Sequence, residues 1–199
     1  MSKRFTVMIA CFALLMLLTG CIPAVITAAT VSTAKFSQDQ TTGQILDDNI
    51  IATKIKAAFI KRGFKKLYSK ITVSVNSGRV LYIGLVSSQQ DVLDAIEIAW
   101  NIRGVSEVID ELQIKSEERD IDIAQYTRDA MITSQIRTRI MTNKIKSINY
   151  NIITKDDVVY IFGLAQNEEE VKKVAEIASK IRKVKSVVSH VKIKNQSTD

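Results

Sequence analysis

An internal repeat constrains the fold of this 199-residue chain more than any other feature of its sequence. The apolar segment 80–85 (VLYIGL) recurs at 159–164 (VYIFGL), and segment 95–99 (AIEIA) recurs at 174–178 (VAEIA). Both pairs share one offset of 79 positions. Self-similarity at a fixed offset indicates tandem copies of one structural unit. The sequence therefore predicts two copies of one small domain.

Each copy is predicted to have the order helix, strand, strand, helix, strand. In the first copy, Asp47 or Asp48 is expected to cap a helix that ends at Gly63. One face of this helix carries apolar residues at helical spacing, namely Ile51, Ile55, Ala58 and Phe59. Residues 71–75 then alternate between apolar and polar, which is typical of a half-buried strand.

A hairpin turn at 76–78 (NSG) is expected to join this strand to a returning strand at 80–86. Ser87 or Ser88 is expected to cap the second helix. The second copy repeats the pattern, with its hairpin turn at 156–157 (DD).

Three glycines are interpreted as structural. Gly84 and Gly163 end the apolar strands, and we expect another part of the chain to pass too close for a side chain. Gly104 is expected to stop the second helix of the first copy. Its equivalent in the second copy is Lys183, which costs a little free energy if the backbone there is left-handed.

The N-terminal residues predict an exported precursor. Lys3 and Arg4 precede an unbroken apolar run at 5–18, which is short for a membrane span and typical of a secretory signal peptide. The run ends in residues 18–21 (LTGC), which resemble the lipobox of bacterial lipoproteins. That resemblance implies cleavage before Cys21 and acylation of its thiol and new amino terminus. The alternatives are an ordinary signal peptide with a chance cysteine, and an uncleaved membrane anchor.

Acylation at Cys21 would make a lasting tether. Each buried methylene contributes about 0.8 kcal/mol, so one acyl chain holds weakly and two or more hold firmly. In many diderm bacteria, an aspartate directly after the lipidated cysteine resembles a signal that retains the lipoprotein in the inner membrane. Ile22 stands there instead, so the resemblance implies the outer membrane. Cys11 lies within the leader, and the mature chain is left with one cysteine and no possible intrachain disulfide.

The repeated unit itself resembles the BON domain, on its α-β-β-α-β order, its strand-ending glycines and its Val-x-x-Val segments at 105–108 and 184–187. Two copies behind a lipobox are similar to the dual BON-domain outer-membrane lipoproteins of diderm bacteria. The resemblance implies an α+β fold, with two tandem α-β-β-α-β domains that each pack a small three-stranded sheet on two helices. It also implies phospholipid binding and support of envelope integrity.

These interpretations divide the chain into six parts. They are a lipoprotein signal peptide at 1–20, a lipidated flexible tether at 21–46, BON domain 1 at 47–115, a linker at 116–127, BON domain 2 at 128–194 and a tail at 195–199.

Charge is distributed unevenly over these parts. The formal net charge is +7 for the whole chain, and also +7 for 128–194, against +2 for 47–115 and −3 for 116–127. An exported basic protein does not routinely meet nucleic acid, so anionic lipid headgroups or acidic envelope partners are the natural targets. Neither a small-molecule substrate nor a cofactor is expected.

The first helix of the second copy is the candidate phospholipid-binding site. Arg128, Met131, Gln135 and Arg139 recur at a spacing that places them on one side of a helix. Arginines beside marginal apolar residues are typical of an interfacial membrane contact. The alternative is a methionine at the edge of the core with solvated arginines. We expect the second copy, and not the first, to carry lipid binding.

Catalytic chemistry is not indicated. His190 is the only histidine, and we expect it on a solvent-facing strand position without a catalytic or metal-binding partner. The acidic run 168–170 is expected at the start of a helix, where carboxylates suit the positive helix end. A hydrolase is therefore a weak hypothesis, and we expect a protein that is not an enzyme.

Leu93 and Trp100 form an apolar pair that only the first copy has. They stand seven residues apart on one side of the second helix, and their equivalents are Lys172 and Ser179. Two interpretations remain open, in which the pair packs against the second copy or the linker, or enlarges the core of the first copy.

The sequence thus predicts a non-enzymatic, lipid-anchored outer-membrane protein that faces the periplasm, binds anionic phospholipid and supports envelope integrity. The alternative is a periplasmic scaffold that recognises an envelope protein or cell-wall machinery. A scaffold should ignore the charge of a lipid surface, whereas a lipid binder should not.

Overall fold

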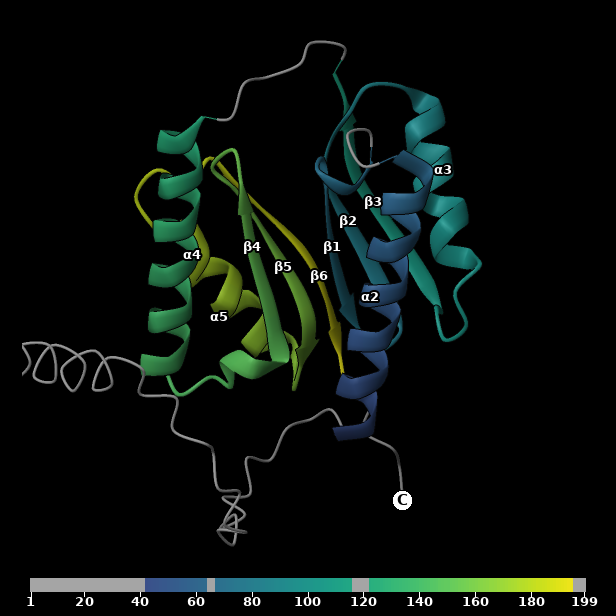
Figure 1. The fold of residues 1–199 in the computed structure, drawn as a ribbon. Coiled ribbons are helices and arrows are strands. Elements are labelled where there is room, and N and C mark those ends of the chain that lie inside the picture. The colour runs from purple at the N-terminus through teal and green to yellow at the C-terminus, as the bar shows by residue number, and fades with distance from the viewer. Residues whose placement is uncertain (1–41, 64–66, 116–121, 195–199) are drawn as a thin grey trace, which may run out of the picture. The chain divides into compact units, whose positions relative to one another are not determined.

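The computed structural model describes residues 42–63, 67–115 and 122–194. Within these ranges both copies have the order helix, strand, strand, helix, strand (Figure 1). The first copy comprises α2 (Thr42–Gly63), β1 (Ile71–Asn76), β2 (Arg79–Val86), α3 (Gln89–Trp100) and β3 (Glu107–Ile114). The second comprises α4 (Ile123–Thr142), the 3-10 helix η2 (Ser147–Asn149), β4 (Tyr150–Lys155), β5 (Val158–Ala165), α5 (Glu168–Ser179) and β6 (Ser186–Ile193). The predicted α+β fold with two tandem α-β-β-α-β domains is confirmed.

Each copy forms its own three-stranded sheet, in the order β1-β2-β3 and β4-β5-β6. The hairpin strands pair antiparallel, and the last strand pairs parallel to the second after the crossover through α3 or α5. The register is the same in both copies, because Ile71 faces Gly84 and Tyr150 faces Gly163. The predicted turns at 76–78 and 156–157 join these hairpins.

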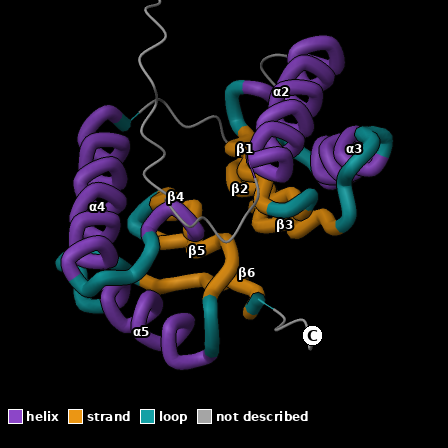
Figure 2. The backbone as a smooth tube through the Cα atoms, turned by 90° about the horizontal axis from the view of Figure 1, so that it is seen from below, coloured by secondary structure: helices purple, strands orange, loops and turns teal. Residues whose placement is uncertain are grey.

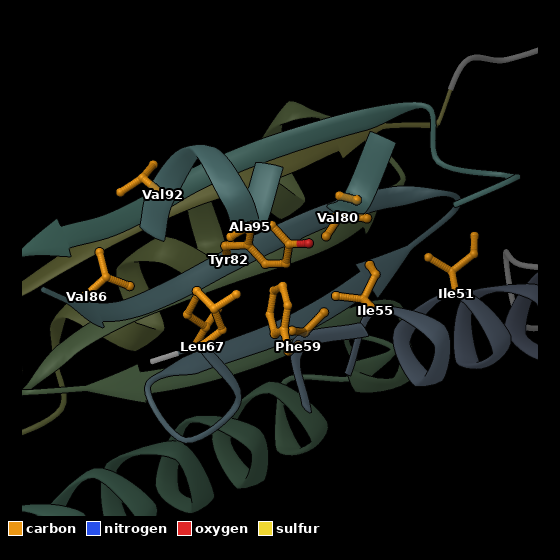
Figure 3. Close-up of a cluster of buried hydrophobic side chains, with 12 residues drawn as sticks. Ile51, Ile55, Phe59, Leu67, Val80, Tyr82, Val86, Val92 and Ala95 are labelled. Carbon is orange, nitrogen blue, oxygen red and sulfur yellow. The ribbon is translucent and has the colours of Figure 1, made fainter. Parts of the chain in front are cut away.

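One face of each sheet is covered by the two helices of its own copy (Figure 2). The first core is centred on Phe59 and Tyr82, whose ring centroids lie 5.5 Å apart (Figure 3). In the second copy the aligned positions hold Ile140 and Ile161, both buried, so aliphatic packing replaces the aromatic pair. Each copy therefore has a complete hydrophobic core of its own.

The opposite faces of the two sheets are also apolar, and they contact each other. Leu81 and Ile83 of β2 form one buried cluster with Tyr160 and Phe162 of β5, each at most 4% exposed. Both β2 and β5 are therefore buried on both faces, which explains why their sequences are almost continuously apolar. This contact, here called the sheet interface, joins the copies into one folded unit.

Polar side chains border the sheet interface. The Arg79 guanidinium lies 5.0 Å from the ring centroid of Phe162, and its Nη2 donates to the carbonyl oxygen of His190 at 3.1 Å. Glu107 accepts hydrogen bonds from Arg79 at 2.9 Å and from Lys192 at 2.6 Å. The hydrogen bond from Lys192, followed by that from Arg79, lowers the pKa of Glu107. These contacts fix one sheet against the other.

His190 takes part in this border, which corrects the expectation of a solvent-facing residue. Its Nε2 lies 2.7 Å from Oε1 of Glu111, and its side chain is only 23% exposed. Strand periodicity within one copy does not reveal this burial, because the outer face of β6 is covered by the other copy.

The first helix of each copy begins earlier than predicted. α2 begins at Thr42, so residues 42–46 of the expected tether are helical. Asp47 and Asp48 lie within α2 and do not cap it. α4 begins at Ile123, so the last five residues of the expected linker are helical as well. The second helices begin as expected, since Ser88 caps α3 through a hydrogen bond from the Asp91 amide.

Gly84 and Gly163 have the same steric surroundings. A Cβ atom at Gly84 would lie 2.1 Å from the carbonyl oxygen of Lys70, and one at Gly163 would lie 2.0 Å from that of Asn149. The close neighbour is the residue preceding the partner strand in each hairpin. Gly104 has φ +100°, and its counterpart Lys183 has φ +78°, so the backbone is left-handed at both positions.

Leu93 and Trp100 belong neither to the core of the first copy nor to the sheet interface, and residues 116–121 of the linker lie outside the described residues. Leu93 is 51% exposed and Trp100 is 55% exposed. The core beneath α3 is completed by Val92, Ala95 and Ala99 instead. The apolar pair is left on the outer side of α3.

Candidate functional site

α4 positions the predicted phospholipid-binding residues. Asp122 caps the helix by accepting a hydrogen bond from the Gln125 amide at 3.0 Å. Ile132, Ile136 and Ile140 are at most 2% exposed and hold one side of the helix against the sheet. This spacing fixes which side chains remain on the outside.

The structure places the predicted residues along one flank of α4. Met131 is 59% exposed, and Gln135 and Arg139 are exposed as well. Arg128 lies at the same flank near the start of the helix, with its side chain 40% exposed. The four residues are therefore brought into one line, at the spacing i, i+3, i+7 and i+11.

Arg128 is engaged in a polar cluster that the sequence did not reveal. Its Nε donates to Oδ1 of Asp157 at 2.9 Å, and its Nη2 donates to the side chain of Gln125. Lys185 contacts the other oxygen of Asp157 at 2.9 Å. Part of the charge on Arg128 is thus balanced within the protein.

The Asp157 carboxylate shows the strength of this cluster. Burial raises its pKa, but hydrogen bonds from Gln125, Lys185 and Arg128 outweigh that effect and lower the pKa to about 2. Asp157 is therefore ionised throughout the neutral range and keeps Arg128 in place.

A second carboxylate, Asp129, supports the hairpin turn of the same copy. It accepts hydrogen bonds from the amides of Asp156 at 2.9 Å and Asp157 at 3.0 Å. In the first copy, Asp48 binds the amides of Ser77 at 2.7 Å and Gly78 at 2.8 Å in the same way. The sequence signal for both is an aspartate three residues before the first buried isoleucine of the helix.

More apolar surface lies beyond the predicted flank. Tyr126 is 74% exposed and Met141 is 64% exposed on α4, and Ile148 in η2 is 56% exposed. The exposed Lys144 lies in the turn after α4. Helical spacing in the sequence does not reveal Ile148, because an isolated isoleucine in a short loop carries no periodic signal.

The first copy has a comparable helix with different charges. Ile50 and Ile60 of α2 align with Met131 and Met141, and they are 43% and 49% exposed. Asp47 and Ala58 stand in α2 where Arg128 and Arg139 stand in α4. The two helices therefore differ more in charge than in exposed apolar side chains.

Other kinds of site find little support. Among the residues that the structure describes, no group of three or more His, Cys, Asp or Glu side chains could hold a metal ion. Within the same ranges, no helix is long and apolar enough to cross a bilayer. Cys21 and the predicted leader at 1–20 lie outside the described residues.

The fold and the duplicated arrangement agree with a family comparison. The family model described as BON domain matches residues 47–116 and 128–195. The chain belongs to the BON-domain family.

Three relatives span most of the chain. A protein of Anaplasma centrale, described as an uncharacterized protein in the gshII 5' region, is 36% identical over 151 residues, or 75% of this chain and 97% of the relative. The outer membrane lipoprotein DolP of Haemophilus influenzae is 31% identical over 86% of this chain and 87% of its own length. The osmotically-inducible protein Y of Escherichia coli is 28% identical over 76% of this chain and 75% of its own length. The proteins to which the chain is similar thus include an outer membrane lipoprotein.

Proposed function

We propose that this chain is a non-enzymatic, lipid-anchored protein of the outer membrane, which faces the periplasm, binds anionic phospholipid through its second copy and supports envelope integrity. Its similarity to the lipoprotein DolP supports the envelope setting. The LTGC sequence at 18–21, after an apolar leader, supports Cys21 as the site of acylation.

The observation that carries lipid binding is the exposed flank of α4. Met131 projects to solvent between Arg128 and Arg139, in a copy with 14 basic and 7 acidic residues. Near an anionic surface each added Lys or Arg contributes about 1 kcal/mol, and an exposed apolar side chain adds burial. Met131 would then enter the headgroup region, with Gln135 and Arg139 beside it.

Because of the polar cluster, we expect Arg128 and Arg139 to have different roles. Arg128 is paired with Asp157, so its contribution to an anionic surface is reduced, and its main effect is to brace the start of α4. Arg139 is exposed near the end of the helix. We therefore expect Arg139 to contribute more to lipid binding than Arg128.

The test is cosedimentation with vesicles of the mature chain carrying Cys21→Ser. Both copies must be kept together, because separation would expose Leu81 and Phe162 of the sheet interface. Binding to anionic but not neutral vesicles is expected, and Met131→Glu or Arg139→Glu should weaken it at least tenfold. Ile50→Glu, the matched change in α2, should leave it nearly unchanged. Equal loss with Ile50→Glu would contradict the assignment to the second copy.

Salt dependence provides a second measure of the same contact. Attraction between charges is screened over about 8 Å at physiological ionic strength, so binding should weaken as salt is added. Vesicle binding that does not depend on salt would show that the charges of α4 do not contribute.

The anchor has its own test. In the precursor, Cys21→Ser should either prevent cleavage or release the cleaved protein from membranes after export. A cleaved Cys21→Ser protein that stays on membranes through alkaline washing would overturn the lipoprotein assignment.

A further inference from the structure

The outer edge of β6 presents backbone groups that the proposed function does not use. Among the described strands β6 has one neighbour, β5, and it ends its sheet (Figure 2). The Lys194 amide donates to the carbonyl oxygen of Ala165, so alternate residues of β6 face β5. The carbonyl oxygen of His190, which accepts a hydrogen bond from Arg79, belongs to this set. The residues whose amides and carbonyls face away from β5 are Val187, Ser189, Val191 and Ile193.

The edges formed by the first strand of each copy are each occupied by a side chain. On β1 the carbonyl oxygen of Val75 accepts a hydrogen bond from Nδ2 of Asn151 at 3.3 Å. On β4 the carbonyl oxygen of Ile152 accepts one from Nη2 of Arg137 at 3.4 Å. Edge groups that are already bonded oppose pairing with a further strand.

The last strands of the two copies differ in this respect. On the outer edge of β3 the Leu112 amide donates to Oδ1 of Asp110 at 2.8 Å. The equivalent residues of β6, 79 positions later, are Val191 and Ser189. Within the part of the chain that the structure describes, no side chain is bonded to a backbone group on the outer edge of β6. Of the four sheet edges described, β6 is therefore the one left open to another strand.

The residues around this open edge are basic. Between Glu176 and Asp199 the sequence has no acidic residue and six basic ones, which are Lys180, Arg182, Lys183, Lys185, Lys192 and Lys194. Arg182 and Lys183 are exposed just before β6 and have no ion pair among the described residues. The three acidic residues of β3 are replaced in β6 by Ser186, Ser189 and His190.

Ion pairs do not cancel this positive charge. Asp157 contacts both Lys185 and Arg128, and each lies 2.9 Å from it. Glu107 is shared in the same way by Arg79 and Lys192. One carboxylate cannot neutralise two cations, so Lys185 and Lys192 add to the positive charge of Arg182 and Lys183. An acidic partner therefore suits this edge.

A hollow lies beside the C-terminal end of β6. It has a volume of about 670 Å³, and Val191, Lys192 and Ile193 line one part of it. Gln44 of α2 and Ser77 in the hairpin turn of the first copy line another part. A strand added at this end of β6 would therefore have space, and its side chains would contact the first copy as well.

We propose that the outer edge of β6 accepts an extended acidic segment of a partner protein as an additional strand. The backbone of that segment would pair with the outward amides and carbonyls of β6. Its carboxylates would lie near Arg182 and Lys183 at one end and near Lys192 at the other. This interaction goes beyond the proposed lipid binding and does not depend on it.

Other occupants fit the edge less well. Two β6 edges from different chains would bring Arg182, Lys183 and Lys192 of both chains together, and like charges across paired strands are destabilising. An anionic bilayer would attract the same basic side chains, but its headgroups do not form the alternating backbone hydrogen bonds that this edge offers.

The experiment uses three labelled ten-residue peptides with the same alternation of valine and threonine in the centre. The first has glutamates at both ends, and the second has lysines there. The third is the acidic peptide with N-methyl groups on its four central amides, which block both of its edges. Fluorescence anisotropy with the mature Cys21→Ser protein should show saturable binding of the first and at least tenfold weaker binding of the others. Equal binding of the acidic and N-methylated peptides, or of the acidic and lysine peptides, would overturn the proposal.

Variants identify the edge. Ser189→Asn places a side-chain acceptor where β3 has Asp110, so it should occupy the Val191 amide without adding charge. It should weaken the acidic peptide at least tenfold, whereas the matched Ser189→Ala should not. Arg182→Glu should weaken it severalfold, and Met131→Glu on α4 should leave it unchanged. Equal affinities of Ser189→Asn and Ser189→Ala would overturn the proposal.

Amide hydrogen exchange measured by NMR reports the pairing directly. The acidic peptide should slow the exchange of the Ser189 and Val191 amides at least tenfold and leave the Leu112 amide unchanged. Binding of the peptide without slower exchange at Ser189 and Val191 would place it elsewhere and overturn the proposal.

Two further measurements separate the other occupants. Ser189→Asn should not reduce cosedimentation with anionic vesicles, and analytical ultracentrifugation should show no self-association that Ser189→Asn removes. Either effect would assign the edge to a membrane or to a second copy and overturn the proposal. Failure of vesicle binding with intact peptide binding would instead reject only the lipid-binding function.

Discussion

The two copies share a backbone but carry different residues where their hairpin turns meet the segment after the second helix. In the first copy a Cβ at Gly78 would lie 2.6 Å from the carbonyl oxygen of Gly104, so glycine is needed. In the second copy the same two positions hold Asp157 and Lys183, both with positive φ. Both copies keep the hydrogen bond that joins these segments, from Ser106 to Gly78 and from Lys185 to Asp157.

This difference shows two solutions to one backbone requirement. Glycine adopts a left-handed conformation without steric cost, whereas Asp and Lys pay for it in strain. In the second copy the strain is offset by the contacts of Asp157 with Arg128 and Lys185. Asp157 also holds Arg128 near the start of α4, so the turn contacts the candidate lipid-binding flank.

The largest expected effect concerns the sheet interface, to which both copies contribute. Phe162 is fully buried in the sheet interface, beneath the Arg79 guanidinium. Phe162→Ala should lower the free energy of unfolding by about 3–5 kcal/mol, as large-to-small changes of buried aromatic residues do. Chemical denaturation followed by circular dichroism measures this effect.

The matched control is Ile136→Val, which lies in the core of the second copy alone and should cost about 1 kcal/mol. If the sheet interface joins the copies, Phe162→Ala should also destabilise the first copy, seen in the emission of Trp100. An effect confined to the second copy would show that the two units fold independently.

The next effect compares equivalent glycines. Gly84→Ala and Gly163→Ala should each cost about 3 kcal/mol, because the new Cβ would meet a carbonyl oxygen at 2.1 or 2.0 Å and force the hairpin apart. The two costs should be similar because the geometry is similar. Gly104→Ala should cost only about 1 kcal/mol, since the second copy accepts a lysine there. Denaturation midpoints of the three variants measure these costs. A cost for Gly104→Ala as large as those for Gly84→Ala and Gly163→Ala would contradict the steric argument.

A smaller effect concerns acid. The folded pKa of Asp157 is about 2, below the ordinary value of 3.8, so its ionised form stabilises the fold above about pH 4. That stability should be lost as the pH falls from about 4 to 2. Asp157→Asn should remove this part of the pH dependence, measured as the unfolding free energy at several pH values.

The first copy has Gly78 at this position, so it has no equivalent carboxylate to titrate. At the sheet interface, hydrogen bonds from Lys192 and then Arg79 lower the pKa of Glu107. Glu107→Gln should therefore remove a separate part of the acid dependence of stability. An Asp157→Asn protein with the full acid dependence of the parent would refute the role of the cluster.

The smallest effect should separate two buried tyrosines. Among the described residues, the Tyr82 hydroxyl is buried without a hydrogen-bond partner, and burial raises its pKa. Tyr82→Phe should therefore be neutral or stabilising by about 1 kcal/mol. Tyr150 donates its hydroxyl to Glu170 in the second copy, so Tyr150→Phe should cost about 1 kcal/mol. Thermal unfolding of both variants measures these effects. A lower midpoint for Tyr82→Phe, or an unchanged midpoint for Tyr150→Phe, would contradict the prediction.

Short-range patterns in the sequence predicted much of the fold. The alternation of 71–75, the turn at 76–78 and the cap at Ser88 depend on neighbouring residues, so one copy sufficed to identify them. The repeat then carried the same assignments to the second copy. The predicted flank of α4 likewise followed from helical spacing, and the structure places its four residues in line.

What the sequence did not yield depends on distant contacts. The roles of Asp48 and Asp129 require knowing which turn lies beside the helix, some 30 residues away. The sheet interface had a local signal, because an unbroken apolar strand such as 80–86 is typical of burial on both faces. Trp100 was expected to be covered because only the first copy has an apolar pair at these positions, and nothing in its own helix indicates otherwise.

The contact between Glu111 and His190 has a consequence for how the duplicated domain evolved. These residues are 79 positions apart, which is the repeat offset, so they occupy the same position in the two copies. Such a contact, with Leu81 and Ile83 facing their equivalents Tyr160 and Phe162, fits a pseudo-twofold axis between the two copies. A symmetric pair of first copies would place two glutamates on that axis, and a pair of second copies would place two histidines there. Fusion of the copies allowed the axis to hold an unlike pair, which favours association of a first copy with a second.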